Sequence, residues 1–119
     1  MMLRRVALAF VLGLPLAAAA APSTVEQARI DRLIDAVAQL KGAQFIRNGQ
    51  PHASADAAKF LREKLKSRGA DVTTAEQFIE RIASASSTSG KPYLIRFADG
   101  RQLPSAEFLR AQLKAIDRP

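Results

Sequence analysis

The sequence predicts a small single α+β domain, with about four helices and a two-stranded antiparallel hairpin between the third and fourth helices. Two observations predict this fold class. Four segments repeat apolar residues at helical spacing, and each opens with a residue typical of a helix N-terminus. A fifth segment, 93–103, holds two β-rich runs on either side of Asp99-Gly100, a frequent hairpin turn. The sequence shows neither an internal repeat nor a linker long enough to separate two domains.

Residues 1–20 are expected to be a cleavable signal peptide. A short basic start precedes an apolar run from Val6 to Leu16, and small alanines follow it up to the expected cleavage after Ala20. An uncleaved N-terminal anchor is the alternative, but the apolar run is shorter than the about 20 residues of a membrane span. The chain is therefore expected to be exported, with no stable membrane span after cleavage.

The mature chain, residues 21–119, is basic and contains no cysteine. Without Arg4 and Arg5 of the signal peptide, 16 of the 18 Lys and Arg residues face 11 Asp and Glu residues, a formal net charge of +5. Such a charge favours anionic surfaces and polymers, although it also serves solubility alone. No basic run is long enough to indicate nucleic-acid binding. The absence of cysteine excludes thiol catalysis and cysteine-based zinc sites.

The first helix is predicted over residues 24–41. Ser23 and Glu26 form a capping box, in which each side chain accepts a hydrogen bond from a free backbone N–H of the first turn. Gly42 is typical of the position just after a helix. The apolar stripe of this helix is formed by Val25, Ile30, Leu33, Ile34, Val37 and Leu40.

Residues 44–51 are expected to form a short extended piece that ends in a tight turn. Phe45 and Ile46 favour β-structure but are too few for a long strand, and Asn48-Gly49 is a strong two-residue turn signal. Arg47 is expected at the tip of this turn.

Two more helices are predicted over residues 55–68 and 74–84. Ser54 is the expected N-cap of the first, and Gly69 is expected after its last residue. A second capping box, Thr73-Thr74-Ala75-Glu76, opens the other helix. The stripe of the helix over 55–68 has basic edges and is formed by Ala57, Phe60, Leu61, Lys64 and Leu65.

The hairpin and the last helix follow a serine-rich loop. Strands are predicted over residues 93–97 and 101–103, and Pro104 stops the second strand because proline cannot donate a ladder hydrogen bond. Ser105 is the expected cap of a helix over residues 106–116. The core face of this helix is formed by Phe108, Leu109, Leu113 and Ile116.

The serine-rich loop from Ser84 to Tyr93 and the Asn-Gly turn are the candidate functional segments. The loop carries six hydroxyl groups and one ammonium group, so it could present a nest of donors to an anion, or simply connect a helix to a strand. If the two segments lie side by side, they form a basic, hydroxyl-lined patch suited to a carboxylate, a phosphate or a sugar polymer. The candidate binding residues are Arg47, Asn48, Gly49, Ser86, Ser87, Ser89, Gly90, Lys91 and Tyr93.

Catalytic motifs are incomplete in this sequence. The loop fails as a phosphate-binding P-loop, because Ala85 stands where the first glycine belongs and Pro92 follows the lysine. A serine hydrolase that uses Ser87 or Ser89 with Lys91 as base remains the alternative function. The single histidine lacks the companions of a metal site, so no metal and no cofactor are expected.

Four motifs occur in one order along the mature chain. They are Phe45-Ile46-Arg47-Asn48-Gly49, then Ala57-Ala58-Lys59-Phe60-Leu61-Arg62 with Lys64-Leu65, then Thr74-Ala75-Glu76-Gln77-Phe78-Ile79, and the loop from Ser84 to Tyr93. Together they resemble the YfeK-like family of small exported bacterial proteins of unknown function. The resemblance implies a periplasmic location in a Gram-negative cell, and it brings no activity.

The favoured function is a non-enzymatic periplasmic binding or accessory module that acts through the two segments. The expected partner is an anionic envelope component or a periplasmic protein. A purely structural or chaperone-like protein is a third hypothesis, which predicts an exposed apolar groove in place of a polar one.

Overall fold

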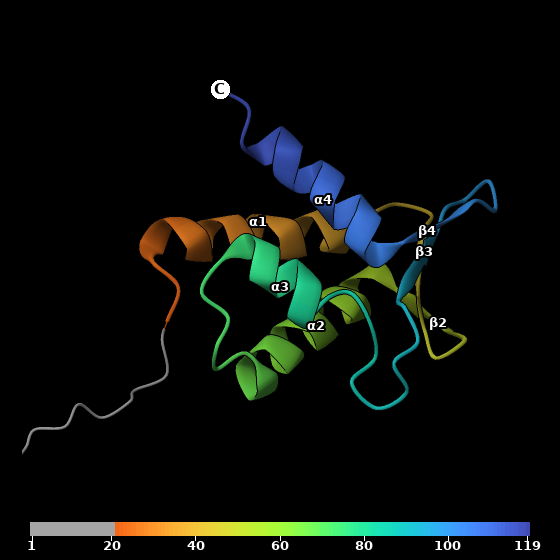
Figure 1. Ribbon diagram of the computed structural model, residues 1–119. Helices are drawn as coiled ribbons and strands as arrows, with labels where there is room; N and C mark the ends of the chain where they lie inside the picture. Colours follow the sequence, from red (N-terminus) through yellow and green to blue (C-terminus); the bar gives the residue numbers. More distant parts are fainter. Residues whose placement is uncertain (1–20) are drawn as a thin grey trace, which may run out of the picture.

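The computed structural model describes residues 21–119, so the predicted signal peptide, residues 1–20, lies outside the described residues. Helices gather at one end of the molecule and strands at the other (Figure 1). The prediction of a small α+β domain with four helices is confirmed. In chain order the elements are α1 (Thr24–Ala38), β1 (Gln44–Arg47), β2 (Gln50–Ala53), α2 (Ser54–Arg68), α3 (Ala75–Arg81), β3 (Leu94–Arg96), β4 (Gln102–Pro104) and α4 (Ser105–Ile116).

The predicted hairpin between the third and fourth helices is confirmed as β3 and β4, but the prediction that it is the whole sheet is wrong, because the sheet has four antiparallel strands in the order β2-β1-β3-β4. Residues 44–53 form a complete hairpin of their own between α1 and α2, and β1 of this hairpin pairs with β3. Asn48 and Gly49 make its two-residue turn with φ angles of 52° and 79°. An isolated two-stranded hairpin is only marginally stable, and the pairing of β1 with β3 joins two of them into one sheet.

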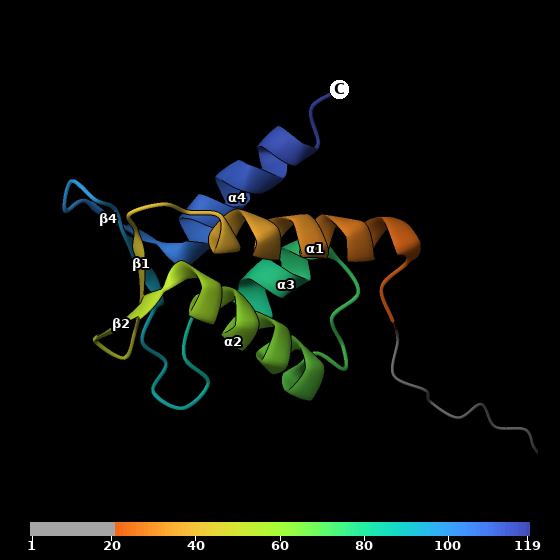
Figure 2. The same ribbon diagram turned by 180° about the vertical axis from the view of Figure 1, so that it is seen from behind.

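One face of the sheet packs on the helices. Phe45 of β1 lies opposite Ile95 of β3, both are buried, and residues opposite each other in antiparallel strands share a face. Figure 2 shows the hairpins at one end of the helical layer, with α1 and α2 running away from them. Each outer strand carries a proline, Pro51 in β2 and Pro104 in β4, which limits pairing of the sheet with a further strand.

All four helices contribute to the hydrophobic core. The side chains with no more than 1 % exposure include members of each helix and of β3: Ile30, Leu33, Ile34, Leu61, Phe78, Ile79, Ile95 and Leu109. Val25, which was expected on the buried stripe of α1, is instead 67 % exposed. Among the described residues, no helix combines the length and the apolar character that a membrane crossing requires.

Two of the predicted cap residues, Ser54 and Ser105, lie inside their helices and do not cap them. Ser54 lies inside α2, and its hydroxyl donates to the carbonyl oxygen of Leu40 at 2.9 Å. Ser105 is the first residue of α4 and is fully buried. The N-cap position is occupied by Pro104, whose side chain makes no capping hydrogen bond. In α3 the cap is Thr74, whose hydroxyl accepts from the backbone N–H of Gln77.

Helix ends also differ from prediction. α1 ends at Ala38 and α3 at Arg81, each three residues before the predicted end. Gly69 has a φ of −98°, so it does not adopt the left-handed conformation that its predicted role implies. A Cβ atom at Gly69 would lie 2.3 Å from the carbonyl oxygen of Leu65. Glycine is therefore required at the end of α2 by close contact and not by positive φ.

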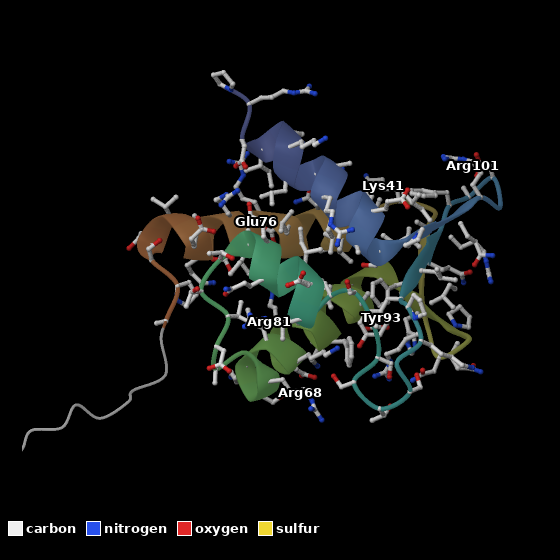
Figure 3. The ribbon with its side chains drawn as sticks, in the orientation of Figure 1. Lys41, Arg68, Glu76, Arg81, Tyr93 and Arg101 are labelled. Carbon is white, nitrogen blue, oxygen red and sulfur yellow. The ribbon has the colours of Figure 1, made fainter. Side chains whose placement is uncertain are left out.

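A salt-bridge cluster joins three helix ends. Glu26 accepts a hydrogen bond from the backbone N–H of Ala75, 2.8 Å away, and pairs with Arg29. Arg29 also binds Asp117 at the end of α4, 2.6 Å away. The Ala75 N–H, followed by Arg29, lowers the pKa of the Glu26 carboxyl group, while its partners raise the pKa of Arg29. Figure 3 shows Glu76 of α3 beside α1 in this region.

Candidate functional site

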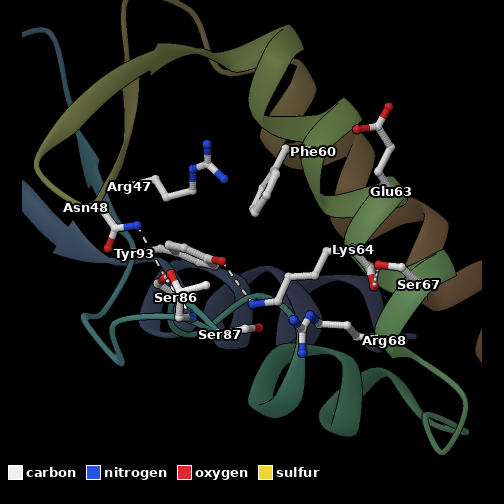
Figure 4. Close-up of a pocket in the computed structure, with 11 residues that line it drawn as sticks. Arg47, Asn48, Phe60, Glu63, Lys64, Ser67, Arg68, Ser86, Ser87 and Tyr93 are labelled. Carbon is white, nitrogen blue, oxygen red and sulfur yellow. Dashed lines mark hydrogen bonds between the residues drawn. The ribbon is translucent and has the colours of Figure 1, made fainter.

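The structure places the Asn-Gly turn and the serine-rich loop side by side. The amide nitrogen of Asn48 donates to the hydroxyl of Ser86 at 3.3 Å (Figure 4). The hydroxyl of Ser89 donates to the amide oxygen of Asn48. Asn48 holds this position with a φ of 52°, a left-handed conformation that asparagine adopts more readily than most residues. Asn48 therefore links two segments that are distant in the sequence.

The loop uses most of its polar groups on itself. The Ser86 hydroxyl accepts from the backbone N–H groups of Thr88 and Ser89, each at 3.3 Å, and the Ser89 hydroxyl accepts from the N–H of Lys91 at 3.2 Å. The backbone N–H of Ser86 donates to the carbonyl of Lys91, and that of Gly90 to the carbonyl of Ser86. These amides are therefore satisfied within the loop, and they do not form the open nest for an anion that the sequence suggested.

A pocket of about 250 Å³ lies between the turn, the loop and α2 (Figure 4). We call it the α2–loop pocket. It brings together basic side chains from two elements with an aromatic pair and several hydroxyl groups. Its lining residues are Arg47, Asn48, Phe60, Glu63, Lys64, Ser67, Arg68, Ser86, Ser87, Thr88 and Tyr93.

Lys64 of α2 lies at the base of the pocket and is only 6 % exposed. Its ammonium group donates to the carbonyl oxygen of Ala85 at 2.8 Å and to the hydroxyl oxygen of Tyr93 at 2.9 Å. It also lies 4.9 Å from the centre of the Tyr93 ring. Burial lowers the pKa of Lys64, and the nearby cations Arg68 and Arg47 lower it further.

Lys64 is not among the predicted site residues, although the sequence contains a signal for it. Lys64 recurs at helical spacing with Ala57 and Leu61, which places its side chain on the buried face of α2. Lys64 was interpreted as part of the basic edge of the apolar stripe. Its position seven residues after Ala57 indicates a buried ammonium group, which requires polar partners.

Tyr93 forms the wall between the pocket and the core. It is 1 % exposed, and its ring lies 5.1 Å from that of Phe45 and 5.9 Å from that of Phe60. Its hydroxyl oxygen accepts a hydrogen bond from the Lys64 ammonium group, and no described residue accepts a hydrogen bond from the hydroxyl itself. Burial raises the pKa of Tyr93, while the cations Arg47 and Arg68 oppose that rise. A buried donor is therefore left at the edge of the pocket.

Two guanidinium groups complete the basic character of the pocket. The guanidinium of Arg47 lies 4.3 Å from the centre of the Phe60 ring, a cation–π contact, and Arg68 follows Lys64 by one helical turn. Within residues 21–119, neither arginine forms a salt bridge. Glu63 also lines the pocket, but Figure 4 shows its carboxylate directed away from Lys64 and Tyr93.

The predicted site residues fall into two groups. Arg47, Asn48, Ser86, Ser87 and Tyr93 line the α2–loop pocket. The remaining four do not line it: Gly49, Ser89, Gly90 and Lys91. Two of these are glycines at turns with positive φ, Ser89 holds Asn48, and Lys91 is exposed.

A serine–lysine pair is not formed between the proposed hydrolase residues. The Ser89 hydroxyl is bonded to Asn48 and to the backbone of Lys91, and Ser87 makes no side-chain hydrogen bond with a described residue. His52 lies beside a separate cavity of about 30 Å³ that it shares with Arg47 and Phe60. Across residues 21–119 there is no group of three His, Cys, Asp or Glu residues that could hold a metal ion.

A hollow between two other helices differs from the α2–loop pocket in charge. A hollow of about 350 Å³ lies between α3 and α4, with the buried side chains of Ile79 and Leu113 in its lining. Acidic and basic groups alternate around it and leave no surplus of positive charge: Glu76, Glu80 and Asp117 against Arg110 and Lys114. The concentration of unpaired cations therefore distinguishes the α2–loop pocket from this hollow.

Comparisons with known proteins give a family but no activity. Residues 24–117 match a family of unknown function, DUF5329. The chain is also 47 % identical over 68 residues to the uncharacterized protein YfeK of Salmonella typhimurium strain LT2. That alignment covers 57 % of this chain and 57 % of the length of YfeK. No solved structure matches the chain. The match over residues 24–117 shows that the chain belongs to the DUF5329 family, as its resemblance to YfeK-like proteins predicts.

Proposed function

We propose that the protein is a periplasmic binding or accessory module that holds an anionic group of an envelope component or a partner protein in the α2–loop pocket. One observation carries this proposal. Arg47, Lys64 and Arg68 face the same pocket, and none of them is neutralised by a carboxylate among the described residues.

This arrangement is unfavourable in the absence of an anion. A buried ammonium group loses hydration, and a neighbouring cation makes its charged form still less stable. Lys64 experiences both effects, because it is buried and because Arg68 and Arg47 lie nearby. A structural role for Lys64 explains its bonds to Ala85 and Tyr93, but it does not explain why two guanidinium groups flank it. An anion in the pocket would stabilise all three cations together.

Binding fits the pocket better than catalysis does. Nucleophilic catalysis requires a hydroxyl in contact with a base. Within residues 21–119, no serine or threonine hydroxyl exchanges a hydrogen bond with a lysine or histidine side chain. The periplasmic part of the proposal is supported by the predicted signal peptide, and the anionic partner is supported by the net positive charge of the mature chain.

The proposal is tested by retention of the purified protein on isolated peptidoglycan and on lipopolysaccharide. The wild type is compared with the double variant Arg47→Ala/Arg68→Ala. The matched control is Arg110→Ala/Lys114→Ala, which removes the same charge from the hollow between α3 and α4. Both changes weaken nonspecific attraction to an anionic matrix equally, so the control isolates the contribution of the pocket.

We expect the control variant to be retained nearly as well as the wild type, and the pocket variant to lose at least about tenfold in affinity, since each lost charge-assisted bond is worth about 1.5–3 kcal/mol. Equal retention of the pocket variant and the control would contradict the proposal. Far-UV circular dichroism of all three proteins checks that the helices remain formed.

A further inference from the structure

We propose that the group held in the α2–loop pocket is a dianionic phosphoryl group, that is, the terminal phosphate of a monoester. This inference rests on the proposed function and specifies its ligand. The donor groups of the pocket, their number and their total charge all point to such a group.

The pocket has a surplus of hydrogen-bond donors. An ammonium group has three N–H donors, and Lys64 uses two of them on Ala85 and Tyr93, which leaves one. The Tyr93 hydroxyl has no acceptor among the described residues. Arg47 and Arg68 add guanidinium donors that no carboxylate occupies. A ligand that matches this lining is rich in acceptors, and a phosphoryl group offers three strong acceptor oxygens.

The charge of the pocket favours a dianion over a monoanion. Arg47, Lys64 and Arg68 carry three positive charges, and Glu63 is the one acidic residue in the lining. A carboxylate carries one negative charge, so it would neutralise one of the three cations and leave the other two facing each other. A phosphate monoester carries about two negative charges at neutral pH and can place one oxygen on each cation.

The binding experiment compares four small anions by isothermal titration calorimetry with the purified protein. The probes are glycerol phosphate as a monoester, sulfate as a permanent dianion, a glycerol phosphate diester and acetate. We expect glycerol phosphate and sulfate to bind at least about tenfold more tightly than the diester and acetate, because the latter lose one charge-assisted interaction or more.

A pH series separates the phosphoryl group from the protein. The second pKa of a phosphate monoester is about 6, so acidification from about pH 7.5 to about pH 5 removes its second charge. Glycerol phosphate should then bind several-fold more weakly, whereas sulfate keeps both charges. Sulfate thereby controls for titration of the acidic and imidazole groups that face the pocket and Arg47: Glu63, Asp56 and His52.

The source of the phosphoryl group is tested with lipid vesicles. Vesicles that contain phosphatidic acid present a monoester headgroup, and vesicles with the same fraction of phosphatidylglycerol present a diester. Preference for phosphatidic acid over both phosphatidylglycerol and free glycerol phosphate indicates a headgroup at a surface. Equal affinity for the free and the lipid-bound monoester indicates a soluble ligand. Either result supports a phosphate monoester as the group that the pocket binds.

The variant for these measurements is Arg68→Gln, because Arg68 is exposed and its loss leaves the core intact. Lys66→Gln is the control, since Lys66 is exposed on the same helix and does not line the pocket. Arg68→Gln should weaken glycerol phosphate binding about tenfold and Lys66→Gln should not. Acetate binding as tight as that of glycerol phosphate would overturn the phosphoryl inference and leave the proposed anion site in place. No binding of any anion, or no effect of Arg68→Gln, would overturn both.

Discussion

Asn48 provides the sharpest test of how the site is assembled. Its side chain exchanges two hydrogen bonds with Ser86 and Ser89, and its backbone adopts a φ of 52°. We expect Asn48→Gly to destabilise the fold by about 1–2 kcal/mol, because two hydrogen bonds of about 0.5–1.5 kcal/mol each are lost. The gain from relaxed positive φ is offset by the greater freedom of glycine in the unfolded chain.

Asn48→Ala separates the stability that the hydrogen bonds contribute from the energetic cost of the left-handed backbone conformation. It removes the same two bonds, and it also places a Cβ-bearing residue without a polar side chain in the left-handed region, which costs roughly 1–2 kcal/mol. Asn48→Ala should therefore be about 1 kcal/mol less stable than Asn48→Gly. Ser89→Ala removes two hydrogen bonds, the one that its hydroxyl donates to Asn48 and the one that it accepts from the N–H of Lys91, and should cost about as much as Asn48→Gly.

Urea unfolding at pH 7 measures these differences, with the fluorescence of Tyr93 as the signal because the chain has one tyrosine and no tryptophan. A free energy of unfolding for Asn48→Gly within a few tenths of a kcal/mol of the wild type would refute the role of Asn48 as a link between turn and loop. Equal stability of Asn48→Ala and Asn48→Gly would refute the enforced positive φ.

Three further outcomes follow from the structure. The lowered pKa of Glu26 means that its bonds stabilise the fold above the unfolded-state value of 4.5 and are lost as pH falls through the folded-state value. Thermal unfolding should therefore show that Glu26→Gln is less stable than the wild type at pH 7, with the difference shrinking in acid. Tyr93 should ionise above its usual pKa of 10.0 in an absorbance titration, and Arg47→Ala should raise this pKa further. Mass spectrometry of the exported protein should find Ala21 as its first residue, whereas an intact N-terminus would indicate the uncleaved anchor.

The helices were predictable from sequence because their signals are local. Apolar residues at helical spacing, such as Leu33 and Val37 in α1 or Leu109 and Leu113 in α4, define a buried face within one element. Their exact ends were less predictable. Ser54 is a typical N-cap residue in the sequence, but its hydroxyl donates a hydrogen bond to the carbonyl oxygen of Leu40, which belongs to another segment. Such a contact depends on tertiary structure and leaves no local pattern.

The sheet was only partly predictable because one strand has a weak local signal and one of the three strand pairings is distant in sequence. The segment Gln50–Ala53 contains a proline and neither a β-branched residue nor Phe, Tyr or Trp, so nothing in it predicts a strand. It is a strand because the Asn48-Gly49 turn directs it back along β1. The pairing of β1 with β3 joins residues about fifty positions apart, for example Phe45 with Ile95.

The site was predictable as a meeting of two loops, but its charged centre was not. The candidates Arg47 and Tyr93 were selected for their place in the turn and the loop, and both line the pocket. Lys91 was selected as the cation of the loop, yet the hydrogen bonds around Ser86 fold the loop so that Lys91 lies outside the lining. The buried cation is Lys64, which a helix on the other side of the pocket supplies.

An NMR titration of the lysine side chains, with and without sulfate, tests the central claim most directly. Lys64 should lose its proton below the ordinary lysine pKa of 10.5 in the free protein, because it is buried between Arg47 and Arg68. Added sulfate should raise the pKa of Lys64. An unshifted pKa of Lys64 in the free protein, or the same pKa with and without sulfate, would contradict an anion site at this pocket.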